Sequence, residues 1–214
     1  MKHVITGLKQ QQRNPNRINV YLDGEFAFGV SRMVAAWLFV GKQLSNEEMI
    51  RLQQSDEVET ALQQALRLIS IRPRSEAEIR RRLEAKEYNS VTCDAVLQRL
   101  LENGLIGDSE FARTWVENRS TFRPRSYRLL SLELRQKGVA EETIGEALEQ
   151  AGDEDELAFK AARIYARRLE SAPREEYLQR LMTFLARRGF AYDLARDVSR
   201  QVWEENQSVS TASS

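Results

Sequence analysis

Arg72-Pro73-Arg74-Ser75 is the stretch that decides the fold, because the same four residues return 51 positions later as Arg123-Pro124-Arg125-Ser126. Apolar residues downstream of both copies recur in the same register and continue into a third copy: Ile79, Leu130 and Leu181, then Leu83, Leu134 and Leu185, then Cys93, Ile144 and Ala195. A period of roughly fifty residues is typical of supersecondary units stacked in tandem. The sequence therefore predicts three copies of one unit over residues 57–206.

Each copy is predicted to form three helices. In the first copy, apolar residues at helical spacing mark a helix over 58–69, and Ser75 with Glu78 forms a capping box that opens a second helix. Ser90 is predicted to cap a third helix, which ends at Asn103-Gly104. In the second copy, Asp108 is predicted to cap the first helix, and two further helices are predicted over 126–136 and 140–150. The third copy predicts helices over 154–169, 174–188 and 192–204. The predicted fold is mainly α, with three tandem three-helix repeats in an elongated, curved array.

The first thirty residues have the pattern of strands. Residues 18–22 and 26–30 flank Asp23-Gly24, which suits a two-residue hairpin turn because both positions tolerate positive φ. Residues 4–9 supply a third strand. A small three-stranded sheet of this kind needs a packing partner, and the apolar run 33–40 is predicted to be a helix that provides it.

Two further signals complete the segmentation. Ser45 and Glu48 form another capping box, which opens a helix predicted to end near Gln54. Residues after Asn206 have too little apolar content to order themselves. The predicted segments are an N-terminal hairpin extension with short helices (1–56), repeats at 57–106, 107–152 and 153–206, and a disordered tail (207–214).

Charge is balanced overall but segregated along the chain. Lys plus Arg and Asp plus Glu both number 32, yet residues 119–137 hold six basic residues against Glu133 alone. On the helix over 126–136, helical spacing puts Leu130 and Leu134 on one side and the arginines on the other. Guanidinium groups match phosphate and carboxylate, so this stripe is predicted to face an anionic partner, and solubility is the alternative role. The candidate binding residues are Arg119, Arg123, Arg125, Arg128, Arg135 and Lys137. Arg72 and Arg74 rank below them because glutamates dilute the first copy.

Residues that could carry chemistry are sparse. His3 is the only histidine, and Cys93 takes a position that Ile144 and Ala195 hold in the other copies, which predicts a core side chain. The chain has no Gly-rich phosphate loop. The sequence therefore predicts no enzyme, no catalytic or metal-binding residue and no cofactor.

The tryptophans, the single cysteine and the lack of a long apolar run support three further predictions. Trp37, Trp115 and Trp203 lie in helical apolar patterns, which favours core packing over base stacking. One cysteine excludes an intramolecular disulfide, and no apolar run is long enough to span a membrane. We therefore expect a cytoplasmic monomer with no membrane partner.

Several short motifs in this order resemble the RecX family, the regulators of the bacterial recombinase RecA. The motifs are Arg72-Pro73-Arg74-Ser75-Glu76, Lys86-Glu87-Tyr88, Gly104-Leu105-Ile106 before Asp108, Glu133-Leu134-Arg135-Gln136-Lys137-Gly138-Val139, and the hairpin run over 19–28. Two residues depart from the family pattern: Gly107 replaces the first of two aspartates, and Glu87 replaces a glycine. Glu87 must then end a helix in a conformation that favours glycine, at some cost in strain.

The resemblance implies a non-enzymatic regulator that binds in the groove of the RecA nucleoprotein filament. It implies inhibition of ATP hydrolysis, strand exchange and coprotease activity in homologous recombination, DNA repair and the SOS response. Single- or double-stranded DNA would be a weaker partner, or one met within the filament. The alternatives are a helical-repeat protein that binds DNA or RNA directly, and a scaffold without effect on either. Salt-dependent binding to naked single-stranded DNA separates these possibilities.

Overall fold

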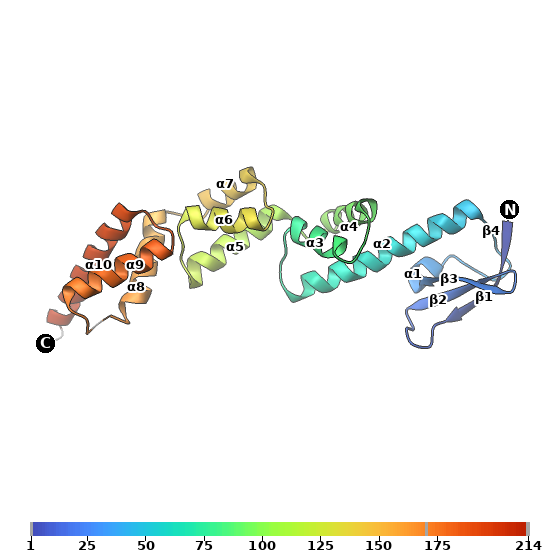
Figure 1. Ribbon diagram of the computed structural model, residues 1–214, viewed down its shortest axis with the longest axis horizontal. Coiled ribbons are helices and arrows are strands. Elements are labelled where there is room, and N and C mark those ends of the chain that lie inside the picture. The colour runs from blue at the N-terminus through green and yellow to red at the C-terminus, as the bar shows by residue number, and fades with distance from the viewer. Residues whose placement is uncertain (1, 170, 213–214) are drawn as a thin grey trace. The chain divides into compact units, whose positions relative to one another are not determined.

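The computed structural model describes residues 2–169 and 171–212, and the chain divides into two compact units, Met1–Ile106 (unit 1) and Gly107–Ser214 (unit 2). Unit 1 consists of a small β-sheet and the first three-helix repeat, and unit 2 of the second and third repeats (Figure 1). The predicted mainly helical fold, with three repeats and an N-terminal sheet, is confirmed.

The sheet in the described part of unit 1 has four antiparallel strands in the order β3-β2-β1-β4. The strands are β1 (Lys2–Gln10), β2 (Arg17–Leu22), β3 (Glu25–Ser31) and β4 (Gln43–Ser45). Asp23 and Gly24 connect β2 to β3 with φ of 50° and 94°, so the predicted hairpin turn is confirmed. Three strands were expected, and β4 is the addition. Its three residues are too few to show an alternating pattern.

The predicted helix over 33–40 is wrong. Helix α1 covers only Arg32–Ala35, and Trp37 is 82% exposed, so the expectation that Trp37 packs in the core is also wrong. Hydrogen bonds to β1 explain the early end of the helix: the amide of Gly41 donates to the Ile5 carbonyl at 2.8 Å, and the Ile5 amide donates to the Lys42 carbonyl at 2.9 Å. Gly41 and Lys42 are thus held at β1, and the helix must end before them.

Helix α2 runs without a break over Asn46–Ile71, where the sequence predicts two helices. The capping box of Ser45 and Glu48 is confirmed. Neither Gly nor Pro occurs between residues 46 and 71, so nothing ends the first helix near Gln54. Asp56 lies in mid-helix, where its buried carboxylate accepts hydrogen bonds from the Ser31 amide and, at 2.7 Å, from Arg17 Nη2. The boundary predicted between residues 56 and 57 therefore falls inside a helix that packs against both the sheet and the first repeat.

Helices α2, α3 (Glu76–Glu84) and α4 (Ser90–Glu102) form the first repeat. Ser75 and Glu78 make the predicted capping box of α3. The cap of α4 is Asn89, whose Oδ1 accepts from the Thr92 amide at 2.9 Å, so the assignment of this cap to Ser90 is wrong. Cys93 is fully buried, as predicted for a core position.

Unit 2 contains the second repeat, formed by α5 (Asp108–Phe122), α6 (Tyr127–Gln136) and α7 (Glu141–Glu149), and the third, formed by α8 (Glu154–Ala166), α9 (Arg174–Arg187) and α10 (Tyr192–Ala212). Gly107 takes the capping position of α5, and Asp108 is its first helical residue rather than its cap. Helix α10 continues to Ala212, whereas the sequence predicts disorder from residue 207; residues 213–214 lie outside the described residues.

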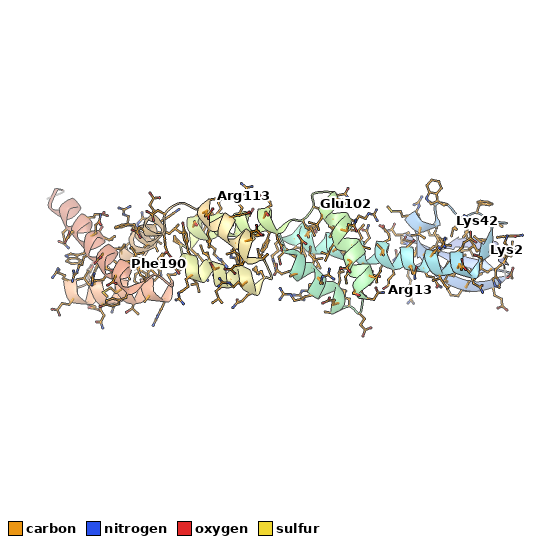
Figure 2. All side chains as sticks on the ribbon, turned by 90° about the horizontal axis from the view of Figure 1, so that it is seen from above. Lys2, Arg13, Lys42, Glu102, Arg113 and Phe190 are labelled. Atoms are coloured by element: carbon orange, nitrogen blue, oxygen red, sulfur yellow. The ribbon has the colours of Figure 1, made fainter. Side chains whose placement is uncertain are left out.

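Apolar side chains gather in four clusters, one in the sheet and one in each repeat. Trp115 and Trp203 are half-buried against the clusters of the second and third repeats, as expected. Phe190, labelled in Figure 2, is buried in the cluster of the third repeat. Each repeat is thus stabilised largely by its own core.

Candidate functional site

The predicted basic stripe lies around the connection from α5 to α6 in unit 2. Arg119 is in the last turn of α5, and Arg123-Pro124-Arg125 links the two helices. Ser126 caps α6, because its Oγ accepts from the Leu129 amide at 3.2 Å. Pro124 is buried, and its fixed φ together with the cap holds the two flanking arginines in place.

Glu133 on α6 organises half of the stripe. Its Oε2 accepts from Arg119 Nε at 2.9 Å and from Trp115 Nε1 at 2.8 Å, while its Oε1 accepts from Arg125 Nη1. The Glu133 side chain is only 13% exposed. Arg119 and Arg125 are therefore oriented by an internal ion pair instead of standing free in solvent, and one carboxylate serves two guanidinium groups.

Trp115 of α5 receives two cations on its ring. The guanidinium of Arg119 lies 4.5 Å from a ring centroid, and Lys137 Nζ lies 4.6 Å from it. Cation–π contacts of this kind contribute about 0.5–2 kcal/mol and fix the position of the charge. Lys137, at the end of α6, is thereby held near Arg119 on the same surface.

The other three predicted residues differ in their environments. Arg135 pairs with Glu141 of α7, with Nε 2.7 Å from Oε2, and this contact raises the pKa of Arg135 and lowers that of Glu141. Arg123 and Arg128 are exposed, and the described residues include no ion-pair partner for either. The structure therefore brings Arg119, Arg123 and Arg125 together, and it leaves Arg123 and Arg128 available to a partner.

Arg188, which the sequence analysis did not single out, joins this group from the third repeat. Its carbonyl accepts from the Ser126 amide at 3.0 Å, so the end of α9 contacts the start of α6. Burial, followed by the charges of Arg123 and Arg119, lowers the pKa of Arg188. Burial and the neighbouring charges of Arg119, Arg188 and Arg123 likewise lower the pKa of Arg125. The one available sequence signal was that Lys86 and Lys137 precede Arg188 at the same 51-residue spacing.

The equivalent arginines of the first repeat, Arg72 and Arg74, both have hydrogen-bond partners within that repeat. Arg72 Nη2 lies 2.8 Å from Glu78 Oε1, and this pair raises the pKa of Arg72. Arg74 Nε donates to the Leu68 carbonyl at 3.0 Å, and burial lowers its pKa. The position 51 residues after Glu78 is Leu129, so Arg123 has no equivalent glutamate. This difference supports the hypothesis that the second copy contributes more to anion binding than the first.

Other kinds of site find little support in the residues that the structure describes. No group of three or more His, Cys, Asp or Glu side chains there is placed to hold a metal ion. Burial raises the pKa of the Cys93 thiol, which disfavours the nucleophilic thiolate. Over the same residues, every helix is too short or too polar to cross a lipid bilayer.

The fold and the site together define a class: a helical-repeat protein with an N-terminal sheet and an arginine-rich surface. Four family models match the chain in order, described as the regulatory protein RecX N-terminal domain (residues 3–45) and the first, second and third three-helix domains of RecX (61–100, 108–148 and 153–198). The chain belongs to the RecX family of regulatory proteins.

Individual relatives agree with this assignment. A protein of Bacillus subtilis (strain 168) named regulatory protein RecX is 32% identical over 94% of this chain and 78% of its own length. Its namesake in Listeria monocytogenes serotype 4a (strain HCC23) is 30% identical over 94% of this chain and 76% of its own. A crystal structure of regulatory protein RecX superposes with a TM-score of 0.71 at 26% identity, covering 92% of this chain and 99% of the other.

Proposed function

We propose that this protein binds the RecA nucleoprotein filament and inhibits its ATPase, strand-exchange and coprotease activities. The ordered match of all four RecX domain models carries this proposal. It would act as a cytoplasmic monomer and without catalysis of its own, regulating recombination, repair and the SOS response.

The proposed contact surface is the arginine-rich face of unit 2, formed by Arg119, Arg123, Arg125, Arg128, Arg135 and Lys137. Within it, Arg123 and Arg128 would make the main contacts, because both are exposed and lack an ion-pair partner among the described residues. Arg119 and Arg125 would add charge from positions that Glu133 fixes. Arg72 and Arg74 would contribute less, because Glu78 neutralises Arg72 and Arg74 is bonded to a backbone carbonyl.

The test is the ATPase rate of the cognate RecA on single-stranded DNA as this protein is added. We expect the wild-type chain to lower the rate. For the same inhibition, the double variant R123E/R128E should require a concentration higher by about tenfold or more, since hydrogen bonds to charged groups contribute about 1.5–3 kcal/mol each. The matched control is R113E/R180E, which reverses two other exposed arginines of unit 2.

The experiment distinguishes a failure of the proposed function from a failure of the proposed contact surface. A wild-type chain without effect on the ATPase contradicts the proposed function. Equal inhibition by R123E/R128E and wild type, with helicity unchanged, contradicts only the proposed surface.

Direct binding of DNA or RNA is the second candidate, and one observation favours it. Phe122, next to Arg123, is 74% exposed and could stack on an unpaired base. A direct binder should hold naked single-stranded DNA with an affinity that falls steeply with salt, whereas the proposed regulator should prefer the preformed filament.

A further inference from the structure

Two guanidinium groups of unit 2 contain buried nitrogen atoms without a hydrogen-bond partner. These atoms are Arg125 Nε and Arg188 Nη1. Among the described residues, Ser120 Oγ is the other buried side-chain N or O atom that has no hydrogen-bond partner. A buried donor of a charged group that lacks a partner costs about 1–3 kcal/mol or more. Folded proteins satisfy most such groups, so an unsatisfied pair in one place requires an explanation, such as a ligand.

The two guanidinium groups belong to one site. The Ser126 amide donates to the Arg188 carbonyl at 3.0 Å, which ties the residue after Arg125 to Arg188 itself. Gly189 packs closely against the Ser126 side chain, because a Cβ added at Gly189 would overlap Ser126 Oγ. Gly189 also has a φ of 89°, which favours glycine. The main chain at Arg125 and the main chain at Arg188 are therefore held close together.

Positive charge at this site exceeds the negative charge that balances it. Arg119 and Arg123 act electrostatically on both Arg125 and Arg188. Glu133 pairs with Arg119 and Arg125 and is the carboxylate of the group, while the described residues include no acidic partner for Arg123 or Arg188. Four guanidinium groups thus share one carboxylate, and an added anion would lower their mutual repulsion.

The donors fit a tetrahedral oxyanion better than a carboxylate. Guanidinium groups present planar forks of N–H donors, and forks that converge from two elements can bond several oxygens of one phosphate group. We propose that Arg125 and Arg188, with Arg119 and Arg123, form a binding site for a single phosphate group. The source of that group is a phosphodiester of nucleic acid or the phosphate of a nucleotide. The site shares Arg119, Arg123 and Arg125 with the surface proposed for RecA, but binding of a free phosphate ligand requires no RecA.

Titration of the full-length protein, without RecA and without polymeric DNA, tests the site. The ligands are inorganic phosphate, a nucleoside 5′-monophosphate, a dinucleotide with one internal phosphodiester, and acetate as the carboxylate control. The readout is the NMR signal of the arginine Nε–Hε groups. We expect saturable shifts of the Arg125 and Arg188 signals with the phosphate ligands, and binding of acetate weaker by about tenfold or more. The phosphate ligand that binds most tightly identifies the source.

Variants at adjacent positions provide the control. R188Q should raise the dissociation constant for phosphate by about tenfold or more, while R187Q removes the same charge from an exposed neighbour and should leave it unchanged. R188K covers the case in which R188Q fails to fold, because lysine keeps the positive charge that contacts the Phe184 ring but lacks the fork of donors. Equal affinity in R188K and wild type, or no saturable binding of any phosphate ligand to the wild-type chain, would overturn the proposal.

Thermal stability gives an independent readout. Phosphate should raise the melting temperature of the wild-type chain and of R187M, because a ligand that binds only the native state stabilises it. R188M removes the donors of Arg188, including the unpaired Nη1, so phosphate should raise its melting temperature much less than that of R187M. A rise of the same size in R188M and R187M would contradict a site at Arg188.

Discussion

At the scale of single residues, equivalent positions of the repeats carry different charges on the same backbone. Glu78 completes the capping box of α3 and forms an ion pair with Arg72. The equivalent residue in the second repeat is Leu129, which has no carboxylate and cannot pair with Arg123. Conversely, the equivalent of Glu133 in the first repeat is Arg82, and its charge disfavours ionisation of Arg74. The differences at these two positions thus move the carboxylate from the arginine before the proline, Arg72, to the arginine after it, Arg125.

Replacement of Glu133 tests how far this residue organises the stripe. In E133Q, Arg119 and Arg125 lose their carboxylate, and we expect the free energy of unfolding to fall by about 1–2 kcal/mol. Both arginines are more than a quarter exposed, which keeps the loss below that of a fully buried pair. Urea denaturation measures the change. E141Q is the control, because the pair of Glu141 with Arg135 is exposed and its loss should leave the midpoint almost unchanged.

Glu87 carries the strain that the sequence predicted. Its φ is 66°, and the equivalent positions are Gly138 and Gly189 with φ of 84° and 89°. Left-handed backbone costs a residue with a side chain about 1–2 kcal/mol, part of which the flexibility of glycine in the unfolded chain offsets. We therefore expect E87G to stabilise the protein by about 0.5–1 kcal/mol, and G138A, its converse, to destabilise it. A lower thermal midpoint for E87G would contradict this account.

At the scale of elements, capping signals predicted helix starts better than apolar runs predicted helix lengths. Ser45 and Ser75 cap the helices expected of them, because a serine oxygen satisfies a local amide whatever the tertiary context. The caps expected at Ser90 and Asp108 lie one residue earlier, at Asn89 and Gly107. The helix predicted over 33–40 is wrong, since Gly41 and Lys42 directly after it bond to β1, a contact with residues far away in the sequence. The prediction divides helix α2 because the first repeat is expected to begin after residue 56, whereas Asp56 contacts β2 and β3 from the middle of one helix.

The capping box of α2 should respond to pH. The pKa of Glu48 is lowered, first by the hydrogen bond from the Ser45 amide and then by the Ser45 side chain. A lowered carboxyl pKa stabilises the fold above the unfolded-state value, and this contribution is lost as the pH falls through the lowered pKa. We expect the amide NMR shifts of Ser45 and Glu48 to titrate together in acid. E48Q should abolish this titration, while E47Q, a change at the adjacent residue in the same turn, should preserve it.

At the scale of the whole molecule, the buried apolar side chains of the described residues fall into four clusters, and Tyr127 packs against two of them, those of the second and third repeats. Leu83 and Leu185 are both fully buried, yet they belong to the clusters of the first and third repeats. Arg188 shows the limit of prediction at this scale: it lies 65 residues after Arg123, and no periodicity indicates that the end of α9 contacts the start of α6. The arginines of one repeat could be predicted, but a site built from two repeats could not.

Separate cores predict local rather than global responses to mutation. L83A should destabilise the first repeat by about 2–5 kcal/mol through the lost apolar contacts and the cavity left behind. Hydrogen exchange should accelerate in α3 and α4 and stay unchanged in α8 to α10, and L185A should give the reverse pattern. Uniform acceleration along the chain in either variant would contradict the division.

Because Cys93 is buried, its reactivity can report how often the first repeat opens. This thiol is the only one in the chain, it is fully covered by the first repeat, and burial raises its pKa. A thiol-reactive dye can therefore reach it only when α3 and α4 part, and the rate of labelling measures how often they do so. Slower labelling after a partner is added would reveal, without any engineered tag, that this partner tightens the first repeat.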